Sequence, residues 1–223
     1  MNAALLQQKL YAAYAAAAQR IGATATLYRP TSSLNPIVTG NIVNTLPASF
    51  NAEDMRYQKA ETYGKALWYC LADGSKLRVG DYLVQQGQTY FIASMAALLP
   101  ILAVKCNRLV RIGRMPVASS PGYTGYSGVV QSAETDVLGT SSGQGLFVSG
   151  WPASILLGGR SEADPGLPSS VKEGGVTILL PASAPVVISE SDTMQDDLGR
   201  DYIIAAAELT ELGWRIEATE EHA

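Results

Sequence analysis

The segment GDYLVQQGQTYFIA at residues 80–93 recurs, with one inserted residue, as SDTMQDDLGRDYIIA at residues 191–205. Each copy has the pattern of two short strands joined by a turn that contains a glycine. At separations of 111 or 112 residues, the coinciding pairs are Asp81/Asp192, Gly87/Gly199, Tyr90/Tyr202, Ile92/Ile204 and Ala93/Ala205. We therefore expect one β-hairpin that occurs twice in the chain.

Two further matches extend this repeat in the same order. Residues 46–50 (LPASF) are similar to residues 151–155 (WPASI), and residues 66–71 (ALWYCL) correspond to residues 176–180 (VTILL). Ordered matches of this kind indicate tandem copies of one unit. The sequence therefore predicts a mainly β protein with two tandem related antiparallel β-barrel or β-sandwich domains. Strands of the first copy are expected at residues 23–28, 40–45, 66–71, 81–84, 89–93 and 101–112.

An alanine-rich segment precedes the first expected strand and predicts an N-terminal α-helix. Asn2 is a helix-capping residue type, and Gly22 stands where a C-terminal stop is expected. An apolar stripe at three- and four-residue spacing consists of Leu6, Leu10, Ala13, Tyr14, Ala17 and Ile21. Periodicity does not decide whether this stripe covers the helix's own domain or a neighbouring subunit.

The expected organisation has four parts. They are the helix at residues 1–22, a first β-domain at 23–114, a Gly- and Tyr-rich linker at 115–128 and a second β-domain at 129–223.

The composition excludes several classes of protein. The only histidine of the 223 residues is His222, which argues against Ser-His-Asp catalysis and histidine-based metal sites. No apolar run reaches the roughly 18 residues that a membrane-spanning helix needs. We therefore expect no enzymatic activity, no metal, no cofactor and no membrane partner. Cys70 and Cys106 lie in apolar runs, so buried free thiols are expected, with a disulfide as the alternative.

Two motifs resemble active-site patterns. Residues 139–143 (GTSSG) satisfy G-x-S-x-G but lack the flanking strand, helix and histidine of a nucleophile elbow, so a loop is expected. Asp196 and Asp197 form an acidic pair at a hairpin tip, which turn chemistry accounts for, with a surface cation site as the alternative. Structural packing accounts for Trp151 and Trp214 better than a sugar-binding aromatic platform does.

Charge is divided unequally along the chain. Residues 1–114 hold 12 Lys and Arg against 5 Asp and Glu, a net of +7, and residues 115–223 hold 4 against 15, a net of −11. Opposite faces of this kind suit subunits that meet head to tail in a cyclic ring, whereas the alternative is that each half is simply solvated. Candidate subunit-interface residues are Leu6, Leu10, Tyr14, Lys105, Arg108, Arg111, Tyr123, Tyr126, Asp196 and Asp197.

Four segments carry a resemblance to a known family. They are residues 99–108 (LPILAVKCNR), 150–156 (GWPASIL), 177–182 (TILLPA) and 196–215 (DDLGRDYIIAAAELTELGWR). These strings resemble proteins encoded in the structural-gene clusters of tailed bacteriophages and prophages. The tandem β architecture is also similar to the small β-barrel proteins of the phage neck, which close the portal and join head to tail as rings and have no catalytic residues.

The resemblance implies a structural virion protein in the head-to-tail connector or collar. It implies a cyclic homo-oligomer, a hexamer or dodecamer, that contacts portal or adaptor proteins and tail or collar proteins, with transient non-specific contact to passing DNA. Such a protein is assembled in the bacterial host cytoplasm and resides in the virion neck or tail. The alternatives are a tail or baseplate adaptor and, from another class, a carbohydrate-binding or cell-wall-degrading β-protein.

Overall fold

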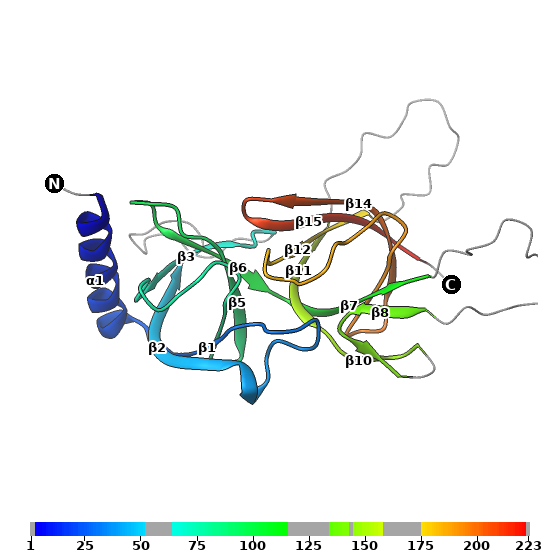
Figure 1. The fold of residues 1–223 in the computed structure, drawn as a ribbon, viewed down its shortest axis with the longest axis horizontal. Helices are drawn as coiled ribbons and strands as arrows, with labels where there is room; N and C mark the ends of the chain where they lie inside the picture. Colours follow the sequence, from blue (N-terminus) through cyan, green and yellow to red (C-terminus); the bar gives the residue numbers. More distant parts are fainter. Residues whose placement is uncertain (1–2, 52–63, 116–133, 143–144, 158–174, 222–223) are drawn as a thin grey trace, which may run out of the picture.

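The computed structural model describes residues 3–51, 64–115, 134–142, 145–157 and 175–221. Over these residues the chain forms one N-terminal helix and two closed six-stranded antiparallel β-barrels that lie side by side (Figure 1). The prediction of a mainly β protein with an N-terminal helix and two tandem related barrels is confirmed.

The first barrel has the strand order β1-β2-β3-β6-β5-β4 and closes where β4 pairs with β1. A short 3₁₀ helix, η1 (Thr39–Asn41), precedes its second strand. The strands are β1 (Ala23–Tyr28), β2 (Ile42–Asn51), β3 (Leu67–Ala72), β4 (Tyr82–Gln85), β5 (Gln88–Ser94) and β6 (Ile101–Cys106).

The second barrel has the order β7-β11-β12-β15-β14-β13 and closes where β13 pairs with β7. Its strands are β7 (Arg108–Arg114), β11 (Trp151–Leu157), β12 (Gly175–Leu180), β13 (Thr193–Asp196), β14 (Asp201–Thr210) and β15 (Gly213–Glu220). An additional strand, β8 (Thr135–Leu138), pairs with the C-terminal part of β7. A short ribbon follows, in which β9 (Thr140–Ser141) pairs with β10 (Phe147–Ser149).

The two barrels match strand for strand. The order of the second barrel is that of the first, with β7 in the place of β1 and the β13–β14 hairpin in the place of β4–β5. Register agrees as well, because Leu46 pairs with Ala25 in the first barrel and Trp151 pairs with Val110 in the second. Both barrels also have a register shift immediately after the same isoleucine of the repeat, Ile92 in β5 and Ile204 in β14. The sequence repeat therefore corresponds to a repeat of topology and register.

The boundary between the barrels lies earlier than the expected residue 114. The run expected as one strand at residues 101–112 is two strands, β6 and β7, separated by Asn107. The Asn107 side-chain amide donates to the Ile155 carbonyl at 2.8 Å, and the Ile155 amide donates to Asn107 Oδ1 at 2.8 Å. Because this side chain binds β11, the chain leaves the first barrel here and β7 belongs to the second. Of the expected linker, residues 116–128 lie outside the described residues.

The strands between the barrels are buried on both faces. Leu83 and Ile92 lie in the core inside the first barrel, whereas their neighbours Tyr82 and Phe91 lie in a second core that extends into the other barrel. Since alternate side chains of a strand point to opposite faces, β4 and β5 serve two cores at once. This double burial accounts for apolar runs without polar alternation in this part of the sequence.

Specific contacts fix one barrel against the other. The Tyr82 hydroxyl donates to the Pro152 carbonyl at 2.8 Å, and the Tyr82 ring meets the Trp151 ring edge-on with 6.1 Å between centroids. The Ser183 hydroxyl donates to the Gly80 carbonyl at 2.8 Å. Tyr82 and Trp151 are fully buried. The tandem barrels therefore share a buried interface that combines aromatic packing with direct hydrogen bonds.

Candidate functional site

Among the basic interface candidates, Arg111 is buried. Arg111 is 4% exposed and binds two carboxylates, Glu134 and Asp136, each at 2.7 Å. Arg114 binds Asp192 at 2.7 Å. Arg111 is therefore held within the second barrel and is not available to a neighbouring subunit, whereas the Arg114 side chain is 40% exposed.

The Arg111 cluster anchors β8 to the second barrel. The two ends of its guanidinium donate to Asp136 Oδ1 and Glu134 Oε2, and Glu134 also accepts a hydrogen bond from the Thr193 hydroxyl. Asp136 in turn accepts from the Ser141 amide at 2.7 Å, which fixes the start of the β9–β10 ribbon. The cluster thus joins β7, β8, β9 and β13 through charge-assisted hydrogen bonds. Its role in these contacts is structural.

Acid is expected to weaken this cluster. Burial raises the pKa of the Asp136 carboxyl, but hydrogen bonds from Ser141 and Arg111 outweigh it, so the pKa lies below its ordinary value of 3.8. The stabilisation from Asp136 is therefore complete above about pH 4 and is lost as the pH falls through the lower folded-state value. In urea titrations between pH 5 and pH 2, we expect the stability difference between wild type and Asp136→Asn to shrink as acid is added. A difference that stays constant over this range would contradict this assignment.

A second arginine–aspartate pair occurs once in each barrel at equivalent positions. Arg29, after β1, donates two hydrogen bonds to Asp81 at 2.7 and 2.8 Å, and Arg114, at the end of β7, donates two to Asp192 at 2.7 Å each. Both aspartates are about 2% exposed or less, and each begins the hairpin of the repeat. Equal geometry at equal positions in both barrels indicates that these pairs hold the barrels closed.

The repeat alignment had already matched the two aspartates. The arginines were not matched, because the expected boundary at residue 114 placed β7 in the wrong barrel.

The acidic pair at the second hairpin is divided between the interior and the surface. Asp196 is fully buried and accepts hydrogen bonds from the Leu198 amide, the Arg200 amide and side chain, and the Tyr202 hydroxyl. Asp197 is exposed, with Arg108 Nε 4.0 Å from its carboxylate. Because Asp196 turns inward and its acceptors are occupied, the pair is an intramolecular turn anchor, and the alternative of a surface cation site is not supported.

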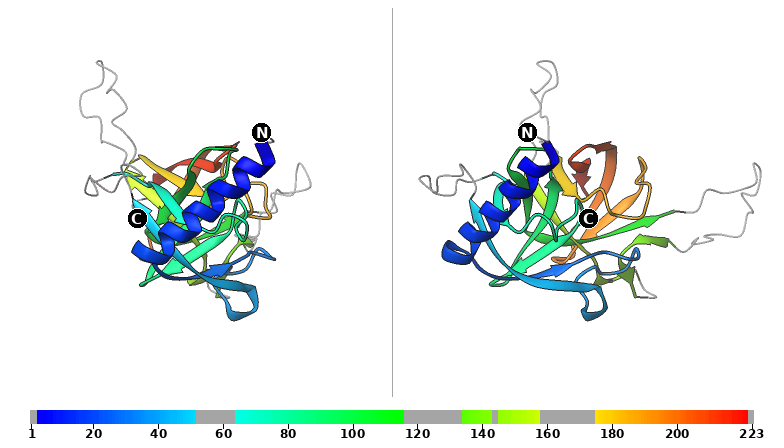
Figure 2. Two further views of the ribbon diagram at one scale, coloured as in Figure 1. Left: turned by 90° about the vertical axis from the view of Figure 1, so that its left-hand side faces the viewer. Right: turned by 60° about the vertical axis from the view of Figure 1, so that its left-hand side comes forward.

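Helix α1 (Ala3–Ile21) packs across β2 and β3 at the end of the first barrel that lies away from the second (Figures 1 and 2). The expected buried stripe is only partly correct. Tyr14 and Leu10 are half-buried, but Leu6 and Ile21 are 40% and 57% exposed, and the fully buried residue is Ala18. An alanine lies innermost because the helix ends close against the β2 backbone.

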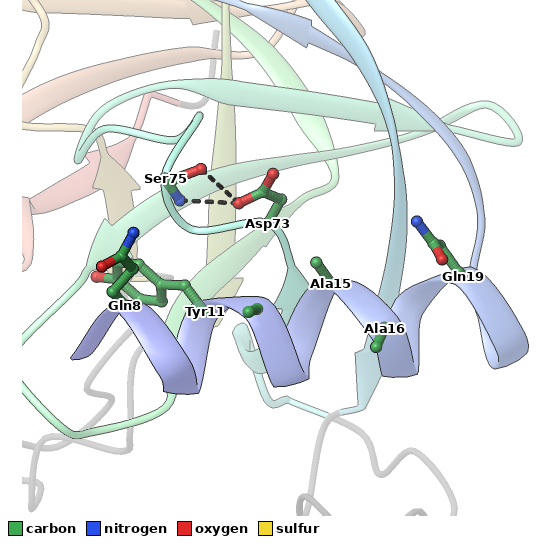
Figure 3. Close-up of a pocket in the computed structure, with 8 residues that line it drawn as sticks. Gln8, Tyr11, Ala15, Ala16, Gln19, Asp73 and Ser75 are labelled. Carbon is green, nitrogen blue, oxygen red and sulfur yellow. Dashed lines mark hydrogen bonds between the residues drawn. The ribbon is translucent and has the colours of Figure 1, made fainter. Parts of the chain in front are cut away.

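A shallow groove follows one flank of this helix (Figure 3). It lies between the helix and the turn at residues 73–75, where Asp73 accepts hydrogen bonds from the amide and hydroxyl of Ser75. The Tyr11 ring lies directly against Gly74, so a side chain at residue 74 would collide with it. Gln8, Ala12, Ala15, Ala16 and Gln19 complete the lining. Because the helix contributes only small or neutral side chains, the residues that line the groove form no cluster of reactive groups.

The other candidates are distributed as follows. Lys105 lies with its ammonium 4.9 Å from the centre of the Trp68 ring, and Tyr123 and Tyr126 lie outside the described residues. Trp151 and Trp214 are 0% and 7% exposed, so packing is their role and they form no exposed aromatic platform.

The cysteines and the serine motif are structural. Cys70 and Cys106 are free and buried, and burial raises the pKa of the Cys70 thiol to about 12. Cys70 pairs with Ile101, and Cys106 is five residues further along β6. This register separates the cysteines by roughly 16 Å, too far for a disulfide. The loop expected for the G-x-S-x-G motif is wrong for Thr140 and Ser141, which form β9, and the Ser141 hydroxyl donates to Asp136.

The difference in net charge between the two halves of the chain is smaller when the boundary is placed after residue 107. Residues 1–107 hold nine Lys and Arg against five Asp and Glu, a net of +4, and residues 108–223 hold seven against fifteen, a net of −8. The two values differ from +7 and −11 because three arginines of β7 move to the second barrel. The sign of each half is unchanged, so an electrostatic difference between the two barrels remains.

No family model, curated protein or solved structure matches the chain. Within the part of the chain that the structure describes, no three His, Cys, Asp or Glu side chains are grouped to hold a metal ion. No helix among those residues is long and apolar enough to cross a membrane.

Proposed function

We propose that this protein is a structural component of a tailed-phage virion that assembles into a ring in the connector between the capsid portal and the tail. The observation that carries the proposal is the combination of two joined barrels with exposed apolar side chains. One of the two cores contains residues of both barrels, and large aliphatic side chains are exposed on the outer helix and on loops, among them Leu5, Leu99 and Leu212. Exposed apolar surface on a soluble protein marks interaction sites.

The charge pattern supports the same proposal. One barrel with its helix carries a net of +4 and the other a net of −8. Placing the first barrel of one copy against the second barrel of the next brings opposite charges together, and repetition of such a contact closes a ring when the rotation allows it. The resemblance of residues 99–108, 150–156, 177–182 and 196–215 to phage structural proteins supports a place in the virion.

The proposal is tested by the mass of the purified protein. Light scattering coupled to size exclusion is expected to give a mass of six or twelve chains of 23.6 kDa, and negative-stain images are expected to show rings. Gold labelling of a tagged copy in virions is expected between head and tail. A label at the distal tail would favour the baseplate adaptor, and a monomer that binds or degrades cell-wall glycan would contradict an assembly role altogether.

A further inference from the structure

The element that precedes each barrel enters that barrel at the same position. Gly22 immediately precedes β1 and lies so close to the Ala48 carbonyl that a side chain would collide with it. Asn107 immediately precedes β7, and its amide donates to the Ala153 carbonyl at 3.0 Å. Ala48 and Ala153 are counterparts, because they pair with the first residues of β1 and β7. Helix α1 therefore joins the first barrel at the position where β6 of the first barrel joins the second.

The packing around these two positions is equivalent as well. Helix α1 packs across β2 and β3, and β6 packs against β11, the counterpart of β2. The turns at residues 73–76 and 181–184 follow β3 and β12, and each has a backbone hydrogen bond from its fourth residue to its first. Tyr11 of α1 lies against the first turn (Figure 3), and Gly80 of the first barrel accepts a hydrogen bond from Ser183 of the second turn.

Side chains of both covering elements reach the core of the barrel that they cover. Tyr11 and Tyr14 of α1 pack against the core of the first barrel. Tyr82, Phe91 and Val104, on the outer face of the first barrel, lie in the core of the second. We call β2, β3 and the turn at residues 73–76 the β2–β3 face. Its counterpart in the second barrel carries a whole barrel, whereas the β2–β3 face itself carries a helix.

The outer face of the second barrel lacks the side chains that join one barrel to the next. Strand register matches three buried residues of the first barrel with smaller or more polar counterparts in the second. The pairs are Tyr82/Thr193, Phe91/Ile203 and Val104/Thr219. Ile203 is 45% exposed, and both threonines are partly exposed. Because a polar outer face ends a stack of repeated units, the stack of barrels ends here.

We propose that the β2–β3 face is a docking face for a β-barrel, and that α1 covers it in the place of one. Figures 1 and 2 show α1, the first barrel and the second barrel in line, as this equivalence requires. The partner that the face fits is a β-barrel whose outer face has the chemistry of β4, β5 and β6. Pro47 of the face is the counterpart of Pro152, whose carbonyl accepts the Tyr82 hydroxyl at 2.8 Å. The docking face is independent of the proposed ring, because it follows from the joint within one chain.

A chain in which the first barrel occurs twice tests this face. Residues 1–107 are followed directly by residues 23–223, so that Asn107 leads into another copy of β1 as it normally leads into β7. The outer face of the leading copy is expected to cover the β2–β3 face of the following copy. The three barrels are then expected to unfold in urea in a single transition and to resist a protease at the new joint.

The matched control gives the leading copy the polar face of the second barrel. Tyr82→Thr and Val104→Thr, made in the leading copy alone, introduce the residue type that the second barrel has at both positions. That barrel is expected to fold without docking, so the control unfolds in two transitions and is cleaved at the joint. If the unsubstituted long chain also unfolds in two transitions or fails to fold, or if the control behaves as it does, the face does not dock a barrel.

A single substitution tests the cover at the natural chain length. Gly74→Leu places a side chain against the Tyr11 ring and is expected to displace α1. Loss of hydrogen-exchange protection at residues 3–21 and increased fluorescence of anilinonaphthalene sulfonate would report the released helix and the uncovered apolar face. Gly40→Leu, at a glycine with open space around it, is the control and is expected to change neither signal. A released helix without dye binding would contradict an apolar docking face.

Discussion

Replacing Trp151 by alanine is expected to lower the free energy of unfolding by about 4 kcal/mol, as truncation of a fully buried Trp or Phe does. Trp151 is 0% exposed and lies at the contact between the barrels, with its ring edge-on to Tyr82. Its indole N–H donates to the Ser33 carbonyl at 2.9 Å. The substitution thus opens a cavity in the shared core and also leaves a carbonyl of the other barrel without this donor. Urea denaturation followed by circular dichroism measures the loss.

Two variants separate these effects. Trp151→Phe keeps an aromatic ring beside Tyr82 but removes the N–H donor, so about half of the loss is expected. Leu34→Ala removes an aliphatic side chain that is 53% exposed and is expected to change stability by less than about 0.5 kcal/mol. If Trp151→Ala changed stability no more than Leu34→Ala does, the two barrels would not depend on a common core.

The duplicated architecture was readable from the sequence because the two copies kept their hairpin signals. Gly87 and Gly199 both have φ near 77° at the turn, a conformation that favours glycine, and so the turn chemistry repeats with the strands. The barrel boundary was not readable. Residues 101–112 contain neither glycine nor proline, and the contacts of Asn107 with Ala153 and Ile155 of β11 divide this apolar run into two strands.

The candidate surface was predicted less well than the fold, for a physical reason. A charged residue type predicts exposure only while it has no partner, and Arg111 and Asp196 are buried because their partners lie elsewhere in the chain. Leucines are mispredicted in the opposite direction. Leu6 satisfies the helical period yet faces outward, since the helix rests on its tyrosine and alanine face. For the charged residues and for the leucine alike, burial depends on which residues the side chain contacts. The spacing of residues in the sequence does not encode those contacts.

Replacing Arg111 by methionine is expected to cost about 3 kcal/mol, because breaking a buried ion pair leaves an uncompensated charge. Its side chain is 5% exposed, and its partners Glu134 and Asp136 are 19% and 25% exposed. The carboxylates are reached by some water, so the cost lies at the lower end of the range for buried pairs. Arg108→Met is the matched control on the same strand. That residue is 35% exposed and 4.0 Å from Asp197, so a loss below about 1 kcal/mol is expected.

Neutralising the partners distinguishes a charge effect from a packing effect. If the loss in Arg111→Met comes from two carboxylates left without a cation, then adding Glu134→Gln and Asp136→Asn removes those charges and is expected to recover more than half of it. If it comes from the volume and shape of the arginine, the added substitutions recover nothing. The same reasoning gives a pH dependence. The pKa of the Asp136 carboxyl lies below its ordinary value, so as acid protonates Asp136 the stability gap between wild type and Arg111→Met is expected to narrow below about pH 4.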